Sequence, residues 1–258
     1  MSRGLKAVDS TLVLLIAIAL AAAAVVVVAS DSDGRDAPVD LGRLVAATTE
    51  ARLPAAPADA TPQATTGGLV VRPTRVLPVF DAPAGRAFAK MPVQQFGDTW
   101  LPVIARRDGW LRVLLPSRPN GSTGWLRESG VVLRSSAYLV RVHLGSRTLD
   151  LIHEGRSIGT WPVAVGEPAT PTPTGRTFLL GSVIDDAQSY SPIILPLGSH
   201  SDTLDTYGGG PGTVALHGWP DASVFGTAAS HGCIRVPADA LERLTQVPLG
   251  TLVIVDNG

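Results

Sequence analysis

A run of nineteen residues without a charge, Thr11–Ala29, divides this chain before any other feature does. At about 1.5 Å of rise per residue, a helix of that length nearly crosses a hydrocarbon core of about 30 Å. Arg3 and Lys6 precede the run and aspartates follow it, so the basic end is expected in the cytoplasm. Residues 1–30 are therefore predicted to be a transmembrane signal anchor of a single-pass protein in the cell membrane, with an extracytoplasmic body.

A cleaved signal peptide is the alternative for the same segment. Signal peptides have a shorter apolar stretch, about 7–15 residues, followed by small residues at the cleavage site. Val27 and Ala29 offer a weak site of that kind. The length favours an uncleaved anchor, whereas cleavage would make the protein secreted.

Composition excludes several classes of function. A formal net charge of −1 over 258 residues gives no reason to expect nucleic acid as a partner. The single cysteine, Cys233, excludes an intramolecular disulfide framework and a Cys-rich zinc site. The glycines at 208–212 do not form a phosphate loop, because no Lys-Ser/Thr pair and helix follow them. We expect no cofactor.

Three segments follow the apolar run. Residues 31–67 are rich in Ala, Pro, Thr and Asp, which is typical of a linker. Residues 68–135 contain short alternating runs separated by turn signals, and this pattern predicts a small all-β barrel or sandwich. The stretch DGWLRVLLPSRPNGSTGWL within them resembles bacterial SH3-like wall-associated domains. The tryptophans of residues 68–135, Trp100, Trp110 and Trp125, fit a core better than a ligand platform.

Residues 137–258 form a second predicted globular unit. Alternation predicts strands, among them Tyr138–Leu144, Thr148–Ile152 and Thr251–Val255, and Glu154-Gly155 marks a hairpin turn. One convincing helix is expected at 237–247, where Leu241 and Leu244 share an apolar face.

The two units differ in charge. Residues 68–136 carry ten Lys/Arg against four Asp/Glu, and residues 137–258 carry six against eleven. Opposite fields favour docking of the β unit on the second unit. The alternatives are that the basic face binds anionic wall polymers, or that both faces are simply solvated.

The chemistry gathers around Cys233. A free thiol outside the cytoplasm risks oxidation, so an exposed cysteine there suggests a chemical role for its sulfur. His231 and Gly232, directly before Cys233, strengthen that interpretation. A cysteine nucleophile works as a thiolate and needs a base, since its ordinary pKa is about 8.5. His217 and His231 are both candidates, and a base on a neighbouring strand, His217, is favoured. An inert buried cysteine is the plain alternative.

A zinc site is another alternative to a nucleophilic role for Cys233. His217, His231 and Cys233, with Asp221 or His200 as a fourth ligand, supply suitable atoms. Their spacing matches no common zinc motif, so no metal is expected.

Three stretches together resemble a known family. SHGCIR at 230–235 follows His217-Gly218, VAVGEPATPTPTGRTFLL lies upstream, and VPLGTLVIV closes the chain. This pattern, over about residues 137–256, is similar to the L,D-transpeptidase (YkuD-type) catalytic domain. The resemblance implies a β-sandwich-like catalytic core with a short helix, so the whole chain is expected to be mainly β.

The resemblance also implies site roles. Cys233 would be the nucleophile, His217 the general base, and the Gly218 carbonyl would hold the imidazole tautomer. The N–H groups of His231, Gly232 and Cys233 would form the oxyanion hole, and Arg235 would hold the site or a substrate carboxylate. The expected cleft and substrate-binding residues are Ser230, Arg235, Trp219, Tyr207, Tyr190 and His200.

Simpler roles stay open for two of these residues. Ser230 also fits a turn hydroxyl, and Arg235 also fits an ion pair with Asp239 or Glu242 on the following helix.

The activity implied is the formation of 3→3 peptidoglycan cross-links through a cysteine acyl-enzyme, in cell wall biogenesis. Peptidoglycan stem peptides would be the substrates. The same thiol site would also serve an L,D-carboxypeptidase or endopeptidase, because only the fate of the acyl-enzyme differs. A non-catalytic wall-binding protein is the third hypothesis, and the His217–Cys233 pair argues against it.

Overall fold

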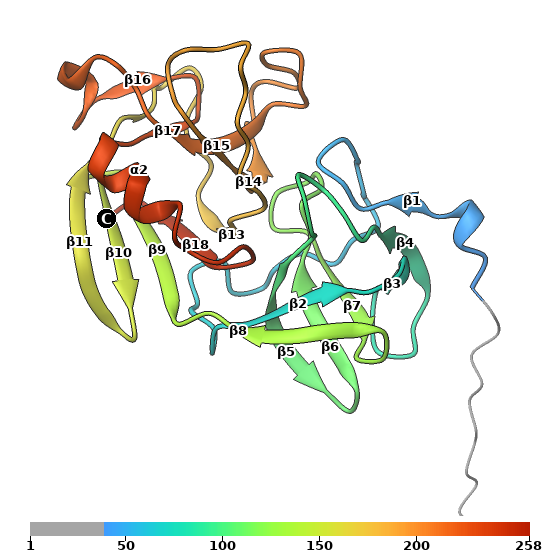
Figure 1. The fold of residues 1–258 in the computed structure, drawn as a ribbon. Coiled ribbons are helices and arrows are strands. Elements are labelled where there is room, and N and C mark those ends of the chain that lie inside the picture. Colours follow the sequence, from blue (N-terminus) through green and yellow to red (C-terminus); the bar gives the residue numbers. More distant parts are fainter. Residues whose placement is uncertain (1–38) are drawn as a thin grey trace, which may run out of the picture. The chain divides into compact units, whose positions relative to one another are not determined.

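Alternating apolar residues build two β lobes in residues 39–258, the part of the chain that this computed structural model describes (Figure 1). Helices are few, as expected for a mainly β chain. None of the helices in residues 39–258 is long and apolar enough to cross a membrane. The anchor predicted over Thr11–Ala29 lies outside the described residues.

The amino-terminal lobe is one eight-stranded sheet in the order β1-β4-β3-β7-β6-β5-β2-β8. Its strands are β1 (Val45–Ala46), β2 (Leu69–Pro73), β3 (Leu77–Phe80), β4 (Ala87–Met91), β5 (Leu101–Arg107), β6 (Trp110–Leu114), β7 (Thr123–Arg127) and β8 (Val131–Ser135). Among the described strands no pairing joins β1 to β8, so the predicted closed barrel is not found. The outermost strand, β1, has only two residues and pairs with β4 alone.

The tryptophans of this lobe divide between core and surface. Trp110 is 6% exposed and meets Phe80 edge-on, with ring centroids 5.0 Å apart. Trp100 and Trp125 are half-buried, and Arg72 and Arg134 lie over the Trp100 ring. The core assignment therefore fits Trp110 best.

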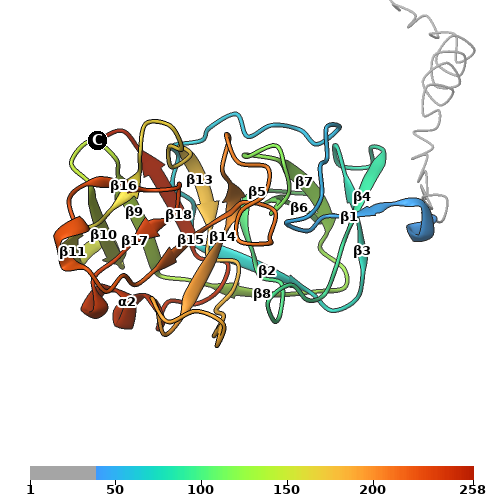
Figure 2. The ribbon, with the colours of Figure 1, turned by 90° about the horizontal axis from the view of Figure 1, so that it is seen from above.

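Residues 39–67, predicted as a linker, form a strap that packs along both lobes in the described structure (Figure 2). It begins with the short 3-10 helix η1 (Leu41–Arg43), and Ala47, Ala51 and Leu53 are buried. These side chains join the core of the amino-terminal lobe. The Ala, Pro, Thr and Asp composition that is typical of a linker gave no sign of their burial.

A buried ion pair joins Asp59 of the strap to Arg176 of the second lobe. Arg176 donates to both carboxylate oxygens of Asp59, at 2.5 and 2.7 Å, and the two side chains are 4% and 3% exposed. Burial alone would raise the pKa of Asp59, but hydrogen bonds from Arg176 and from the Thr61 backbone lower it overall. The carboxylate is therefore charged at neutral pH.

The second lobe packs two sheets and a helix around one core. A five-stranded sheet, β11-β10-β9-β18-β13, faces a three-stranded sheet, β14-β15-β17, and β12 pairs with β16. The elements are β9 (Tyr138–His143), β10 (Thr148–His153), β11 (Arg156–Pro162), β12 (Val165–Gly166), β13 (Gly175–Phe178), β14 (Ile194–His200), β15 (Thr213–His217), η2 (Ala222–Val224), β16 (Ala228–Ser230), β17 (Ile234–Arg235), α2 (Ala238–Leu244) and β18 (Leu252–Asp256). Leu241 and Leu244 of α2 are buried, as the sequence predicted.

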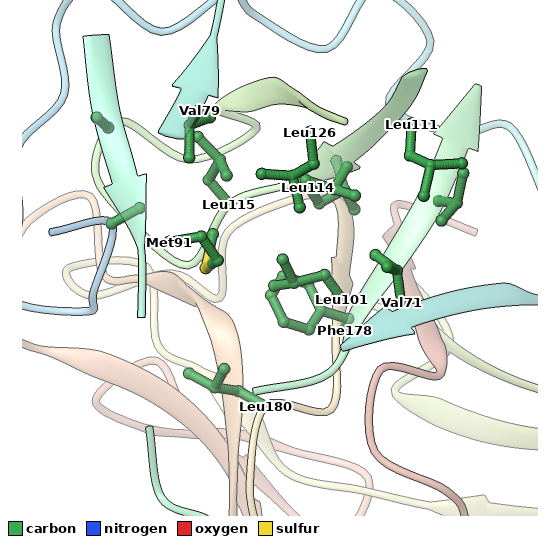
Figure 3. Close-up of a cluster of buried hydrophobic side chains, with 14 of the residues drawn as sticks. Val71, Val79, Met91, Leu101, Leu111, Leu114, Leu115, Leu126, Phe178 and Leu180 are labelled. Carbon is green, nitrogen blue, oxygen red and sulfur yellow. The ribbon is translucent and has the colours of Figure 1, made fainter. Parts of the chain in front are cut away.

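Strand β18 belongs to both cores. Side chains alternate across a strand, and here Leu252 and Ile254 enter the core of the amino-terminal lobe while Val253 and Val255 enter the other. Phe178 at the end of β13 and Leu180 join the same amino-terminal core, where Figure 3 shows them near Leu101, Val71 and Met91.

The lobes thus dock, but charge is not the main cause. A fully buried Leu, Ile or Phe contributes roughly 1.5–3 kcal/mol to stability, whereas an exposed ion pair contributes about 0–1 kcal/mol. Arg52 and Asp59 of the strap both form ion pairs with the second lobe. The Arg52–Asp205 pair has side chains 63% and 81% exposed, and in the buried Asp59–Arg176 pair the cost of desolvation offsets much of the attraction. The burial of apolar side chains from β13 and β18 therefore contributes most of the stability of the junction between the lobes.

His200 provides a test of the junction between the strap and the second lobe. Its ring is fully buried, and its Nε2–H donates to the Thr49 carbonyl at 2.9 Å. Burial, and then the charge of Arg118, lower the pKa of His200 to about 4. The unfolded chain binds this proton near pH 6.5.

We predict that stability falls as pH drops from 6.5 towards 4, by on the order of 3 kcal/mol through this group. His200→Gln keeps a donor for Thr49 and does not titrate, so it should remove that part of the pH dependence. Urea unfolding of both proteins at several pH values measures it. Parallel curves for the two proteins would contradict the prediction.

Candidate active site

Parallel pairing of β15 with β17 places the predicted residues together. Leu216 pairs with Ile234 and His217 with Arg235, so Cys233 lies level with Ala215. Leu216 and Ile234 point into the core. Because side chains alternate, Ala215, His217, Cys233 and Arg235 all project to the opposite face, where they line a cleft of about 760 Å³.

His217 is held in one tautomer. Its Nδ1 lies 2.7 Å from the Gly218 carbonyl, which only accepts hydrogen bonds, so Nδ1 carries the proton and Nε2 is the basic nitrogen. Burial lowers the pKa of His217 most, the Gly218 carbonyl opposes this, and the charge of Arg235 adds to the lowering. The imidazole is neutral at pH 7.

Cys233 is half-buried and unpaired. Burial raises the pKa of its thiol, while the Ala215 backbone N–H and the charge of Arg235 act in the opposite direction. The cleft is therefore lined by a thiol and a neutral imidazole.

The loop before Cys233 is fixed by its own hydrogen bonds. Gly232 has φ +113°, a conformation that favours glycine. Its N–H donates to Ser230 Oγ at 3.1 Å, and the Ser230 hydroxyl donates to the Cys233 carbonyl at 2.5 Å. Ser230 is 1% exposed, so its hydroxyl serves the turn, and the Gly232 N–H expected in the oxyanion hole is already paired.

Aromatic side chains surround the imidazole. Tyr190 meets His217 edge-on at 5.0 Å between centroids, and Trp219 lies 5.5 Å from Tyr190. The Arg235 guanidinium lies 3.5 Å from the centroid of Trp219, and its Nη1 donates to the Ala229 carbonyl. The helix residue Asp239 accepts from Trp161 Nε1 instead, so the alternative ion pair with Arg235 is not formed.

His231 and Tyr207 lie at the exposed side of the cleft. The Tyr207 hydroxyl is 3.3 Å from His231 Nδ1, and Tyr207 is 53% exposed. His200, also expected in the cleft, is buried against Thr49 instead. No group of three His, Cys, Asp or Glu able to hold a metal occurs within residues 39–258.

Two sets of supporting residues were missed from the sequence. The Ser191 hydroxyl accepts the Gly218 N–H at 2.8 Å and donates to the Ile193 carbonyl, which fixes the residue that holds His217. Thr172 donates to the Gly232 carbonyl at 2.9 Å and accepts the Gly166 N–H. The only sequence signal for the second set was Thr-Pro-Thr-Gly at 172–175, within the stretch VAVGEPATPTPTGRTFLL that resembles the family.

We predict that Thr172→Val destabilises the protein by about 1–3 kcal/mol, because it leaves the Gly166 N–H and the Gly232 carbonyl without this partner. Valine keeps the shape of the side chain. Thr227→Val, at an exposed position with a local hydrogen bond, is the matched control. Equal urea midpoints for the two variants would count against the role of Thr172.

The comparisons with known proteins agree on the second lobe. Residues 137–255 match the YkuD family, described as the L,D-transpeptidase catalytic domain. The chain is 28% identical over 168 residues to the Bacillus subtilis protein YkuD, whose name places it among the L,D-transpeptidases, covering 62% of this chain and 95% of that protein. It is 33% identical over 119 residues to the Bacillus licheniformis protein of the same name, covering 46% and 65%.

Among solved structures, L,D-transpeptidase 3 from Mycobacterium tuberculosis is similar at 18% identity and a TM-score of 0.39, over 53% of this chain and 75% of that one. The catalytic domain from the E. faecium L,D-transpeptidase is similar at 20% identity and a TM-score of 0.36, over 47% and 98%. The family and sequence matches support an L,D-transpeptidase catalytic domain at residues 137–255.

Proposed function

We propose that this protein is a peptidoglycan L,D-transpeptidase that forms 3→3 cross-links through an acyl-enzyme on Cys233. The observation that carries the proposal is the His217 tautomer: the Nδ1–H donates to the Gly218 carbonyl and leaves Nε2 as a base. His217 ends β15, which pairs with β17 directly after Cys233. The family match over residues 137–255 supports the same reaction class.

In acylation the sulfur of Cys233 bonds to the carbonyl carbon of the third stem residue, a diamino acid, while the thiol proton passes to His217 Nε2. The peptide bond to D-alanine then breaks. D-alanine leaves with the proton from His217. The raised pKa of the thiol and the lowered pKa of the imidazole mean that proton transfer accompanies attack, because no thiolate is stored beforehand.

The second half transfers the acyl group. The side-chain amine of another stem peptide attacks the thioester and loses a proton to His217. His217 passes this proton to the departing sulfur, and the 3→3 amide is formed. The N–H groups of His231 and Cys233 are proposed to hold the oxyanion. Arg235 is proposed to bind a substrate carboxylate from its place over Trp219.

The location follows from the sequence. We propose that the uncharged run Thr11–Ala29 holds the enzyme in the cell membrane, with the catalytic domain outside. The basic amino-terminal lobe is proposed to meet anionic wall polymers, and its likeness to SH3-like wall domains stays a prediction.

The decisive experiment incubates the purified protein with disaccharide-tetrapeptide and reads product masses. A cross-linked dimer and loss of D-alanine are expected, together with an acyl adduct on Cys233. Cys233→Ala should abolish both products, because a covalent mechanism has lost its nucleophile, and should leave the melting temperature near that of the wild type. Tripeptide alone would identify a hydrolase, and activity above a few per cent in the variant would refute the nucleophile.

His217→Ala should slow acylation about 10²–10⁴-fold and His231→Ala much less, since only His217 has the fixed tautomer. Burial lowers the pKa of His217, so the acid limb of kcat/KM should lie below the ordinary histidine pKa of about 6.5. Single-turnover acylation from pH 5 to 8 tests both points. A larger loss at His231 would exchange the two roles, and an acid limb above pH 6.5 would contradict a desolvated base.

A further inference from the structure

The loop that carries Tyr207 into the cleft is tied down from outside the catalytic domain. This loop, residues 201–212, joins β14 to β15. Its tip is a tight turn in which Tyr207 and Gly210 exchange backbone hydrogen bonds of 3.0 Å. At its base the Ser201 N–H donates to the Gly212 carbonyl at 2.9 Å.

One side chain of the amino-terminal lobe, Arg118, forms hydrogen bonds to three backbone carbonyls of this loop. The Arg118 guanidinium donates to Ser201 O at 2.8 Å, to Leu204 O at 3.0 Å and to Pro211 O at 2.9 Å. These acceptors stand at both ends of the loop, so a single planar cation closes it. Lysine lacks the fork of donors needed to reach several carbonyls in one plane.

Arg118 is itself held in place. Its backbone N–H donates to Ala51 O at 2.9 Å, and its carbonyl accepts from Leu53 N–H at 2.7 Å, both in the strap. Two residues on, the Asn120 amide donates to His200 O at 2.7 Å and to Asp202, at the start of the same loop. The loop is therefore attached to a fixed surface of the amino-terminal lobe.

The amino-terminal lobe also reaches the cleft directly. Phe96, between β4 and β5, lines it together with Val183 and Ile184. A Cβ on Gly181 would lie 2.5 Å from the Cβ of Phe96, so the backbone of the catalytic domain comes close to this ring. The cleft is thus bounded in part by residues outside the matched family region.

We propose that the amino-terminal lobe takes part in substrate binding at the cleft. Arg118 is a positioning residue: it holds the 201–212 loop and thereby places Tyr207 against His231 and the bound stem peptide. This inference rests on the proposed function for its substrate. It assigns to the lobe a role in substrate binding that is separate from any wall attachment.

The test compares the full-length wild type with Arg118→Met, Arg118→Lys and, as matched control, Arg106→Gln, an exposed arginine paired with Glu128 on the same lobe. In Arg118→Met, amide hydrogen exchange over 201–212 should quicken at least about tenfold, since three charge-assisted hydrogen bonds are lost. KM for disaccharide-tetrapeptide should rise about tenfold with a smaller change in kcat. Alkylation of Cys233 by iodoacetamide should keep its rate.

Arg118→Lys should fall between the wild type and Arg118→Met, and Arg106→Gln should match the wild type in every readout. Melting temperatures check that each variant folds. If Arg118→Met does not fold, Arg118→Lys, which keeps the charge and the aliphatic part of the side chain, serves in its place. Unchanged exchange over 201–212, or faster exchange with an unchanged KM, would overturn the proposal. A wild type that never acylates would refute the proposed function instead, and the exchange of the loop amides would still decide whether Arg118 holds it.

Discussion

The burial of Phe178, Leu180, Leu252 and Ile254 in the core of the amino-terminal lobe is the interaction on which the rest of the structure depends. These residues belong to segments that also wall the catalytic core. Strand β18 contributes to both cores from its two faces, so neither lobe can shift without opening apolar surface in both. At roughly 1.5–3 kcal/mol for each buried side chain, this junction outweighs the exposed ion pair beside it.

The junction brings an arginine of the amino-terminal lobe against a loop that borders the cleft. Arg118 and the 201–212 loop are about eighty to ninety residues apart in sequence, yet they meet in three hydrogen bonds of 2.8–3.0 Å. Such contacts persist only where both backbones are fixed. The strap supplies part of that fixation. It bonds to the backbone N–H and the carbonyl of Arg118, and its Asp59 forms the buried pair with Arg176.

The residues proposed for catalysis could be chosen from the sequence, whereas the residues that support them could not, for a physical reason. Cys233 and His217 can be chosen from the sequence because a thiol and an imidazole are suited to act as nucleophile and base. The pairing of β15 with β17 places both side chains on one face. Arg118, Ser191 and the strap act through distant backbone partners, and single residues carry no sign of them. One signal was overlooked: LVIV at 252–255 is apolar at every position, as expected for a strand buried on both faces.

The two buried histidines show why burial alone does not identify a base. Burial lowers the pKa of both His200 and His217, and each donates one ring N–H to a backbone carbonyl. The difference is the other nitrogen. In His200 it is Nδ1, buried without a partner among the described residues, so protonation there only costs stability. In His217 it is Nε2, in a ring that lines the cleft with Cys233. Desolvation keeps both imidazoles neutral at pH 7. His200 then serves as a structural donor to Thr49, and His217, the proposed base, keeps an unprotonated Nε2 in the cleft.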